Sequence, residues 1–361
     1  MAAMVEVHVV NALIRPDLRQ GALFSALDFV NGLVAPSFLF LAGFSLYLST
    51  QPRIEAMGAG RTPSLATLGR IGLLWLLGYL LHIPAFSLQH LLVATTPDQW
   101  RQFAGIDVLQ CIASSLLLLF LLRLSIRRET ILLVAVALAG LAAVLSAPLV
   151  YRPGALDHLP LAIAAYLGPV GSSLFPLLPW FGFLAAGAAA SLLVLRARET
   201  GRMEPFMRRL FLTGLALAGL CLPLLLFFKN GQLLIADERP HVLFFAARLG
   251  FVFMLLALCH LGLQGKATIH PLLALAGRES LAVYVFHLQA LYQPAVHGQS
   301  LVSLIGPRLT LGQCLLASIA LLLALLPPVW AWHGLKSLHP QTGRWTMLAL
   351  FAGGSLFFLL T

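Results

Sequence analysis

Apolar runs recur along the whole chain and are separated by short stretches rich in Gly, Pro and charged residues. Most runs hold roughly 18–22 apolar residues, and a helix of that length crosses a hydrocarbon core about 30 Å thick. The pattern predicts eleven helices, over residues 2–14, 28–49, 66–85, 107–124, 130–150, 174–195, 210–228, 241–263, 272–292, 311–332 and 345–361.

The composition agrees with an all-α polytopic membrane protein. Of the 361 residues, 60% are hydrophobic and 10% are charged, whereas a soluble domain has about 25% charged residues. These values exclude an ordinary soluble enzyme, a disordered chain, a collagen and a coiled coil. The sequence contains no internal repeat of fixed period and no low-complexity linker. We therefore expect residues 1–361 to form a single transmembrane domain.

The basic residues are concentrated in alternate loops. Fourteen Lys and Arg residues fall in the loops after the even-numbered helices, and seven fall in the other loops. By the positive-inside rule, this excess predicts a cytoplasmic N-terminus and an external C-terminus in the cell inner membrane. The loops also account for the net charge of +10, so we do not expect a nucleic-acid partner.

The first predicted helix contains an imidazole near mid-bilayer. His8 and Asn11 lie on one face, because residues three apart share a side of a helix. Glu6 lies about 200° around the helix from His8, so we expect it to pair with another helix. Ionisable groups at membrane depth are costly and tend to face a cavity or a partner. A structural histidine in a helix–helix hydrogen bond is the alternative.

Two polar pairs stand near the outer ends of predicted helices. Asp28 and Asn31 are three residues apart, and so are Asp107 and Gln110. Each aspartate is equally typical of an N-terminal helix cap. Gln110 lies deeper in the bilayer, where an amide needs a partner.

The C-terminal half contributes further polar groups. Arg248 is expected about 10 Å below the outer surface at 1.5 Å per residue, so it needs a carboxylate or an anionic ligand. Ser280, Tyr284 and His287 share a helix face that runs from the inner toward the outer half. Arg278 lies in the inner half of the same helix.

The inventory limits the chemistry. The sequence has no CxxC, HExxH, P-loop or strand-associated GxGxxG motif, so no motif supports a metal site, ATP or a dinucleotide. A histidine with amide and carboxylate neighbours suits acyl transfer, because the attacking hydroxyl or amine must lose a proton. The same groups suit a proton-coupled transporter or a lipid-linked sugar permease. A structural membrane protein without turnover is a third interpretation.

Five segments resemble the bacterial branch of the heparan-α-glucosaminide N-acetyltransferase-like membrane family, which is similar to the wider superfamily of transmembrane acyltransferases. They are MVEVHVVNAL (4–13), LDFVNGLVAPSFLFLAGFSLYLS (27–49), DVLQCIA (107–113), FPLLPWFGFLAAGAA (175–189) and LAGRESLAVYVFH (275–287). The resemblance implies an eleven-helix enzyme that passes an acetyl group from cytoplasmic acetyl-CoA to a sugar on the far side.

The chain departs from this family in two places. Family members usually carry an RG pair several residues before the segment that matches 4–8, and this chain lacks it. With a first helix of about 13 residues, shorter than a full span, this suggests a start site further upstream. The lysosomal enzyme carries its catalytic histidine after the first helix, but residues 12–26 contain none. The assignment of the catalytic histidine therefore moves to His8.

The leading hypothesis is a membrane acyltransferase that acts on an envelope or exported glycan. His8 is predicted to be the general base or a transient acyl carrier, oriented by Asn11. The expected substrate-binding residues are Asp28, Asn31, Asp107, Gln110, Arg248 and His287. The expected ligands of the acetyl-CoA phosphates are Arg278, Arg208 and Arg209. Expected partners are membrane lipids and a glycan or lipid-linked sugar acceptor, and the sequence is compatible with a homo-oligomer.

The charge distribution gives a direct test of orientation. A reporter fused after residue 205 should give a cytoplasmic signal, and one fused after residue 361 an external signal, because five predicted spans lie between these positions. Signals from the same side at both positions would contradict the arrangement of eleven spans.

Overall fold

The computed structural model describes residues 1–55, 64–230, 239–263, 271–293 and 299–338, with isolated positions after 338. Within these ranges the regular elements are helices, apart from one isolated bridge between Ile14 and Leu309. The prediction of an all-α fold is confirmed. By Cα packing the chain divides into two compact units: unit 1 is formed by residues 1–34 and 265–361, and unit 2 by residues 35–264.

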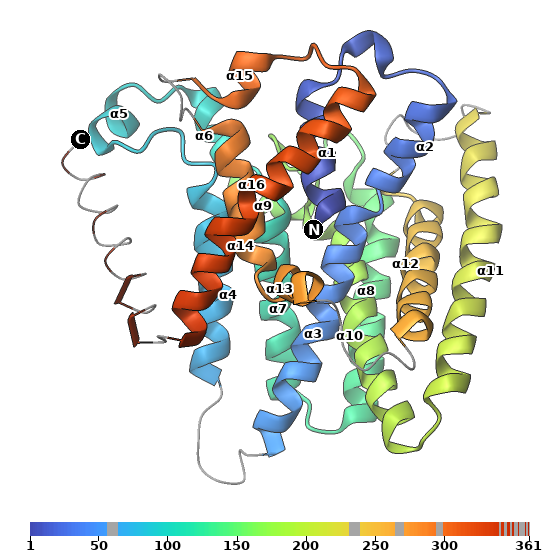
Figure 1. The fold of residues 1–361 in the computed structure, drawn as a ribbon. Coiled ribbons are helices and arrows are strands. Elements are labelled where there is room, and N and C mark those ends of the chain that lie inside the picture. The colour runs from blue at the N-terminus through green and yellow to red at the C-terminus, as the bar shows by residue number, and fades with distance from the viewer. Residues whose placement is uncertain are drawn as a thin grey trace. The chain divides into compact units, whose positions relative to one another are not determined.

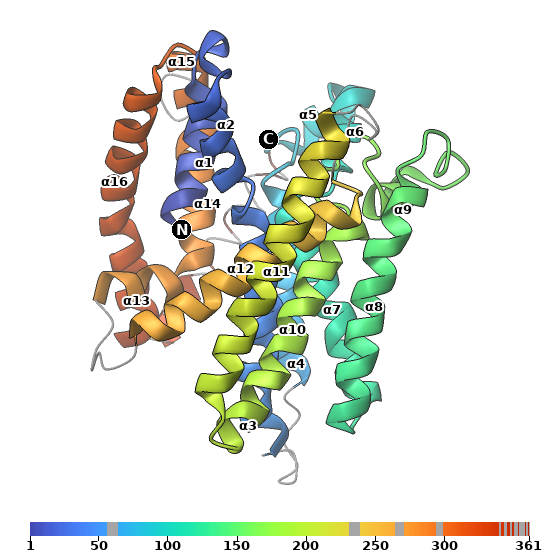
Figure 2. The same ribbon diagram turned by 90° about the vertical axis from the view of Figure 1, so that its right-hand side faces the viewer.

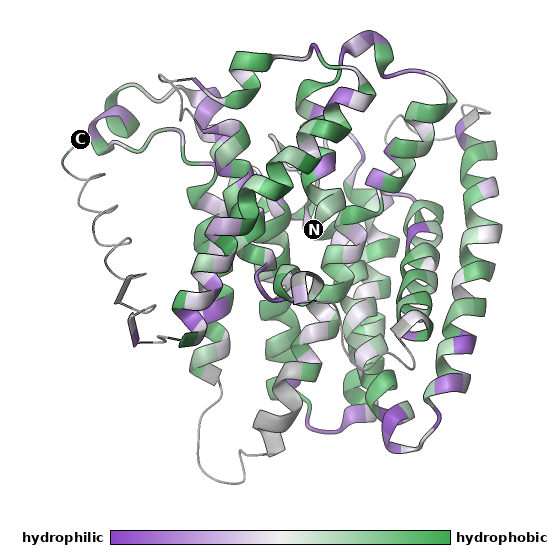
Figure 3. Cartoon of the chain, in the orientation of Figure 1, coloured by the Kyte–Doolittle hydropathy of each residue, from purple (hydrophilic) through white to green (hydrophobic). Residues whose placement is uncertain are grey.

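Helices that could span a membrane account for most of the described chain. Seven are long and apolar enough, and three shorter apolar helices occur at Ala2–Leu13, Leu65–Leu80 and Ser280–Tyr292. These ten segments correspond to ten of the eleven predicted helices, which supports a polytopic membrane protein. The eleventh prediction, 345–361, lies largely outside the described residues. Figure 3 shows hydrophobic residues along the helices and hydrophilic ones gathered at the turns.

Unit 1 joins the two ends of the sequence. Its elements are α1 (Ala2–Leu13), the 3-10 helix η1 (Pro16–Leu18), α2 (Ala22–Asn31), α13 (Pro271–Arg278), α14 (Ser280–Tyr292), α15 (Leu301–Ile305) and α16 (Leu311–Leu338). Helix α1 packs against α14 and α16 (Figure 2). Val5, Val9 and Leu13 are buried on one face of α1 because they recur every four residues. After α1, the Leu309 N–H donates to the Leu13 carbonyl at 2.9 Å, which ties α1 to the chain before α16.

Unit 2 is a bundle around one central helix. Its elements are α3 (Val34–Glu55), α4 (Ser64–Leu80), α5 (Leu88–Val93), α6 (Pro97–Phe103), α7 (Val108–Ser125), α8 (Glu129–Val150), α9 (Leu161–Leu167), α10 (Leu177–Glu199), α11 (Met203–Asn230) and α12 (Val242–Leu263). Helix α10 contacts α7, α8, α9, α11 and α12 (Figure 1). Most of its residues are buried, because it has helices on all sides.

Two pairs of glycines let helices of unit 2 approach closely. A Cβ on Gly43 of α3 would collide with the Leu184 carbonyl of α10, and one on Gly187 would collide with the Phe40 carbonyl. In the same way, a Cβ on Gly214 of α11 would lie 2.5 Å from the carbonyl oxygen of Gly250 in α12. Small residues at such contacts are typical of membrane helices, whose association depends on van der Waals packing.

The two ends of unit 2 differ in character. The short turns after α7 and α10 lie at one end, and α5, α6 and α9 lie at the other (Figures 1 and 2). The turn between α10 and α11 contains Arg196, Arg198 and Arg202 near its ends. The predicted excess of positive charge therefore gathers at one end of this bundle.

Two predicted helices are interrupted in the structure. The segment predicted at 28–49 begins earlier, at Ala22, and breaks at Gly32 and Leu33 between α2 and α3. Asp28 therefore lies in the last turns of α2, and its interpretation as an N-terminal cap is wrong. The segment predicted at 272–292 breaks at Glu279 between α13 and α14. The predicted spans extended across both breaks because the flanking segments are apolar, although Asn31 precedes the first break and Arg278 adjoins the second.

The close contact between α3 and α10 predicts a large effect of a small substitution. Gly187→Val should lower the free energy of unfolding by about 3 kcal/mol or more, because its Cβ meets backbone that cannot move aside. Gly219→Ala is the matched control, since nothing lies within 4 Å of a Cβ there. Thermal unfolding in detergent measures both variants, and equal stabilities would contradict the observed packing.

Candidate active site

Two imidazoles face each other between α1 and α14. The ring centroids of His8 and His287 are 5.0 Å apart, with the planes tilted by 53°. Tyr292 lies edge-on to His8 at 6.3 Å, and Tyr284 lies edge-on to His287 at 5.5 Å. The predicted face of α14 is confirmed in that Tyr284 and His287 are both buried. The two histidines were predicted separately, and nothing in the sequence pairs them.

A hydrogen bond determines the tautomer of the His287 imidazole. Its Nδ1 lies 2.9 Å from the carbonyl oxygen of Val283, one turn earlier in α14. A carbonyl accepts only, so Nδ1 is the donor and Nε2 keeps a lone pair when the ring is neutral. His287 is completely buried, and Nε2 has no hydrogen-bond partner among the described residues. The lone pair is therefore an available proton acceptor inside unit 1.

Glu6 has a partner on a neighbouring helix, as predicted. The side-chain nitrogen of Asn31 in α2 donates to the Glu6 carboxylate at 3.4 Å. Asn31 therefore contacts α1, and its predicted role in substrate binding stays a prediction. Asp28 is exposed on α2. Asn11 is also exposed, and its carbonyl accepts from Arg19 at 2.7 Å.

The break between α13 and α14 contains a buried carboxylate. Glu279 is 4% exposed and accepts from Lys336 at 2.6 Å and interacts with His333 Nδ1 at 2.9 Å. Both partners belong to α16, so these contacts connect α14 to α16 within unit 1. Arg278, predicted to bind acetyl-CoA, is exposed at the end of α13.

Asp107 caps α7 and also pairs with a histidine. Its carboxylate accepts from the Val108 N–H at 2.7 Å, which confirms the capping interpretation. The other carboxylate oxygen lies 3.4 Å from His82 Nε2, just beyond the end of α4. His82 Nδ1 lies 2.8 Å from the carbonyl oxygen of Gly78. Both ring nitrogens thus face acceptors, and the Asp107 hydrogen bond raises the pKa of His82 above its usual value.

His82 was missed in the sequence. It falls within the predicted span 66–85. An ionisable residue in a span usually pairs with another polar group, because an unpaired charge is costly there. The sequence therefore indicated that His82 needs a partner, but only the fold shows that this partner is Asp107, 25 positions later.

Gln110 and Arg248 lie in the interior of unit 2. Gln110 is fully buried, and neither of its side-chain polar atoms has a partner among the described residues. A Cβ on Gly78 would lie 2.8 Å from the Gln110 amide, so the glycine makes room for this side chain. Arg248 is 8% exposed, and its guanidinium lies 4.6 Å from the centroid of the Phe244 ring. The predicted substrate contacts of these two residues stay predictions.

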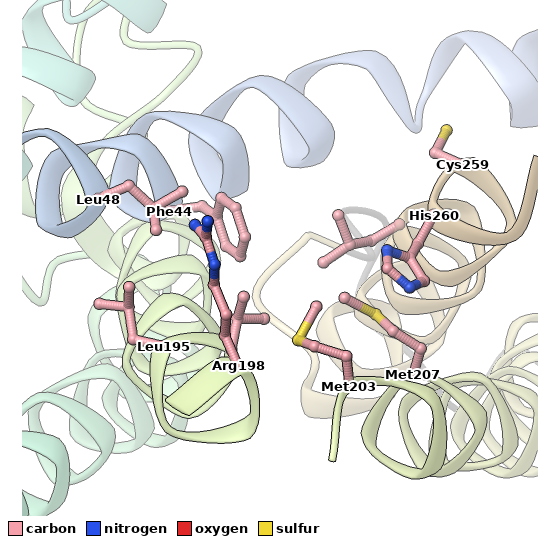
Figure 4. A pocket seen from close by; sticks show the side chains of 10 residues that line it. Phe44, Leu48, Leu195, Arg198, Met203, Met207, Cys259 and His260 are labelled. Carbon is pink, nitrogen blue, oxygen red and sulfur yellow. The ribbon is translucent and has the colours of Figure 1, made fainter. Parts of the chain in front are cut away.

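Two cavities flank the hairpin of α10 and α11. The larger, about 480 Å³, lies among α3, α10, α11 and α12 and is mostly apolar. Figure 4 shows Arg198 beside Phe44, with Met203, Met207 and His260 grouped toward the other side of the view. The smaller, about 230 Å³, is also mostly apolar, and three arginines, Arg196, Arg202 and Arg209, are among its lining residues. Arg208, also predicted to bind acetyl-CoA, is exposed on the same hairpin.

The residues around the smaller cavity fit a phosphate-bearing ligand. Guanidinium groups bind phosphate oxygens through two parallel hydrogen bonds, which lysine cannot do. Three guanidinium groups around one cavity therefore suit the phosphates of a nucleotide such as the one in acetyl-CoA. Of the predicted ligands, the structure places Arg209 at this cavity and adds Arg196 and Arg202.

The His82–Asp107 pair predicts a pH-dependent contribution to stability. Because the pKa of His82 is raised in the fold, the pair stabilises fully below the unfolded value of about 6.5. This contribution is lost as pH rises through the folded pKa. Asp107→Asn keeps the cap, because Asn and Asp cap helices equally well. The variant should lose at most about 1 kcal/mol, since both groups are partly exposed.

Thermal unfolding of the wild type and Asp107→Asn from pH 6 to pH 9 measures this contribution. The difference in Tm should be largest at pH 6 and should vanish toward pH 9. Asp98→Asn is the control, because it removes an exposed pair with Arg101 that contains no histidine. A difference that grows with pH would contradict the assignment.

Comparison with known proteins places the chain in a family. The family model described as heparan-alpha-glucosaminide N-acetyltransferase, catalytic, matches residues 1–228. Neither the curated proteins nor the solved structures give a match. The matched part contains His8, Asn31, His82 and Asp107, whereas His287 lies beyond it. The chain therefore belongs to the heparan-alpha-glucosaminide N-acetyltransferase catalytic family, whose members are membrane acetyltransferases with acetyl-CoA as donor.

Proposed function

We propose that this membrane acetyltransferase moves the acetyl group of cytoplasmic acetyl-CoA to a sugar or glycan on the outer face of the inner membrane. The observation that carries this proposal is the paired imidazoles of His8 and His287, with His8 inside the part of the chain that matches the catalytic family model. In an acetyl transfer the acceptor oxygen or nitrogen must lose a proton, and imidazole titrates in the range that this requires.

His8 is assigned as the general base. It is half-buried, whereas His287 is completely enclosed, so His8 is the imidazole that an acceptor can reach. In surroundings of low dielectric constant, two adjacent positive charges repel strongly. The pair therefore accommodates one extra proton rather than two, and His287 Nε2 provides a neighbouring lone pair. The new bond forms between the acceptor atom and the acetyl carbon, the carbon–sulfur bond breaks, and the acceptor proton passes to His8.

The donor side is assigned to the basic end of unit 2. Arg196, Arg202 and Arg209 line one cavity, and we assign them to the phosphates of acetyl-CoA, which supplies the activated acetyl thioester. Arg208 on the same hairpin adds positive charge there. Arg278, exposed at the end of α13 in unit 1, stays a predicted phosphate ligand. The positive-inside rule places these loops in the cytoplasm, which is where acetyl-CoA is made available.

The acceptor side is assigned to the opposite end of unit 2. Asp107 and Gln110 begin α7 near α5, α6 and α9, away from the basic hairpin (Figure 2). In unit 1, Asp28 and Asn31 occupy α2. With the N-terminus in the cytoplasm, we assign all four residues to the external face.

Substitution of the imidazoles tests the proposal. His8→Ala should lower transfer of radiolabelled acetyl from acetyl-CoA by about 10²–10⁴-fold, the usual contribution of a general base. His287→Phe should also lower turnover, because the lone pair beside His8 is lost. The measurement uses purified protein with glucose, glucosamine and N-acetylglucosamine as acceptors, together with extracted envelope glycans.

His158→Ala is the matched control, because His158 is exposed in the turn after α8. It should retain full activity. All variants are checked for thermal unfolding in detergent, so that loss of fold is distinguished from loss of chemistry. If His8→Ala keeps more than about a tenth of the activity, His8 is not the base. Acceptor-independent uptake of a sugar into vesicles, without acetyl transfer, would favour a transporter instead.

A further inference from the structure

The larger cavity beside the α10–α11 hairpin is built from one repeated feature. Each of the four helices that line it contributes two residues four positions apart, so both lie on one face of their helix. Three of these pairs are Val194 and Arg198 of α10, Met203 and Met207 of α11, and Leu256 and His260 of α12. The pair on α3 is apolar. The volume of about 480 Å³ falls within the range of ligand sites, about 300–1,000 Å³.

The lining of this cavity changes from basic to apolar with depth. Arg198 lies one residue before the end of α10 at Glu199, and Val194 lies one turn deeper in the bundle. On α12, His260 is likewise one turn closer to the helix end than Leu256. The nitrogen-containing side chains therefore lie at the end of the bundle, and hydrocarbon walls lie below them. The headgroup and acyl chain of a lipid follow each other in the same order in a bilayer.

Arg198 supplies a positive charge to the open end of the cavity. Among the described residues, its exposed guanidinium takes part in no salt bridge. The stretch from residue 196 to 209 contains five arginines and two glutamates, so the surroundings are also positive. Figure 4 shows Arg198 beside Phe44 at the cavity. A guanidinium binds phosphate oxygens through two parallel hydrogen bonds, so the cavity favours a phosphate-bearing head on an apolar tail.

A phospholipid of the surrounding membrane meets both requirements without leaving the bilayer. The cavity is open to the outside of the bundle, because Leu48, Arg198 and Cys259 of its lining are exposed. Methionine side chains on its wall are flexible and adapt to a chain of irregular shape. The positive charge of a zwitterionic headgroup is repelled by the arginines, whereas an anionic headgroup carries none. Basic pockets between membrane helices are typical sites for anionic headgroups.

We propose that this cavity binds an anionic phospholipid such as phosphatidylglycerol. Arg198 binds the phosphate, and one acyl chain packs against Met207 and Leu256 in the apolar part. The lipid contacts α3, α10, α11 and α12 at once, so it holds the α10–α11 hairpin against its two neighbours. This inference goes beyond the proposed function, because neither the imidazoles nor the acetyl acceptor enters into it.

Thermal unfolding and native mass spectrometry of the purified full-length protein test the site. The protein in detergent is titrated with dioleoyl phosphatidylglycerol, with dioleoyl phosphatidylcholine or with inorganic phosphate. Phosphatidylglycerol should raise Tm most, because a ligand that binds only the folded state stabilises it. Phosphatidylcholine should raise Tm less, and phosphate should leave it unchanged because it has no acyl chain. Arg198→Gln should weaken phosphatidylglycerol binding about tenfold, through the loss of charge-assisted hydrogen bonds, and leave phosphatidylcholine binding unchanged.

Two further variants separate the headgroup from the chain. Leu256→Trp places a larger side chain in the cavity and should weaken binding of both lipids. Arg127→Gln is the matched control, because Arg127 is exposed in the turn between α7 and α8, at the same end of unit 2, and does not line the cavity. It should bind both lipids as the wild type does. The Tm without lipid shows whether each variant folds, and the exposed position of Arg198 keeps the test valid if Leu256→Trp does not.

Three results would overturn the proposal. Equal binding of the two lipids, unchanged in Arg198→Gln and Leu256→Trp, is the behaviour of lipid around any membrane protein. Palmitoyl-CoA that binds more tightly than phosphatidylglycerol and displaces it would assign the cavity to an acyl donor. A changed oligomeric state in Leu256→Trp, with lipid binding unaltered, would assign it to a second copy of this chain. Arg198-dependent lipid binding in a protein without acetyl transfer would support the site and contradict only the proposed function.

Discussion

The close approach of helix backbones in unit 2 is the constraint on which the bundle depends. In a bilayer, lipid tails are as apolar as leucine, so helices gain little by hiding apolar surface from their surroundings. They gain instead from dense contact, which α10 achieves by meeting α3 at Gly43 and Gly187. Glycines at Gly214 and Gly250 do the same for α11 and α12. Helix α10 also contacts α7, α8, α9, α11 and α12. The positions of these helices, and of the cavities between them, therefore depend on how closely α10 packs.

Several polar side chains among the described residues form pairs between elements that are far apart in the sequence. Glu6 pairs with Asn31, and Glu279 pairs with Lys336 and His333 within unit 1. In unit 2, Asp107 pairs with His82. Each pair offsets the cost of placing a charged group away from water. His287 Nε2 and the Gln110 amide differ, since neither has a partner among the described residues. Such groups are costly in apolar surroundings, which makes both sites candidates for ligand contact.

The two units contain different kinds of candidate functional groups. Unit 1 contains the two imidazoles that can exchange a proton. Unit 2 contains arginine-lined and apolar cavities at one end and an aromatic, hydrogen-bonded surface at the other. In the proposed function, the imidazoles supply the base, the arginines the donor site, and the opposite end of unit 2 the acceptor site. Each element here is built on helices held by packing or caps, which gives functional side chains defined positions.

The sequence by itself determined the class of protein, ten helical segments and the candidate functional residues. Apolar runs predict spanning helices because burial in lipid is a local property of each segment. His8 and His287 stood out because ionisable groups are rare at that depth. The short helices α5, α6 and α15 escaped the apolar pattern, although Ser87, Thr96 and Ser300 cap them. The spacing of Thr96 and Gln99 is a sequence signal that could have found α6.

Only the tertiary structure decided which of these residues meet. The contact of His8 with His287 joins positions 279 residues apart, and Tyr166 reaches Trp75 across 91 positions. The breaks at Gly32 and Glu279 were also missed, because the apolar segments on either side were joined into one predicted span. Periodicity describes how one helix faces its surroundings, and it contains no information about which neighbour fills that space. Those pairings depend on close packing between helices, so they exist only once the whole bundle is formed.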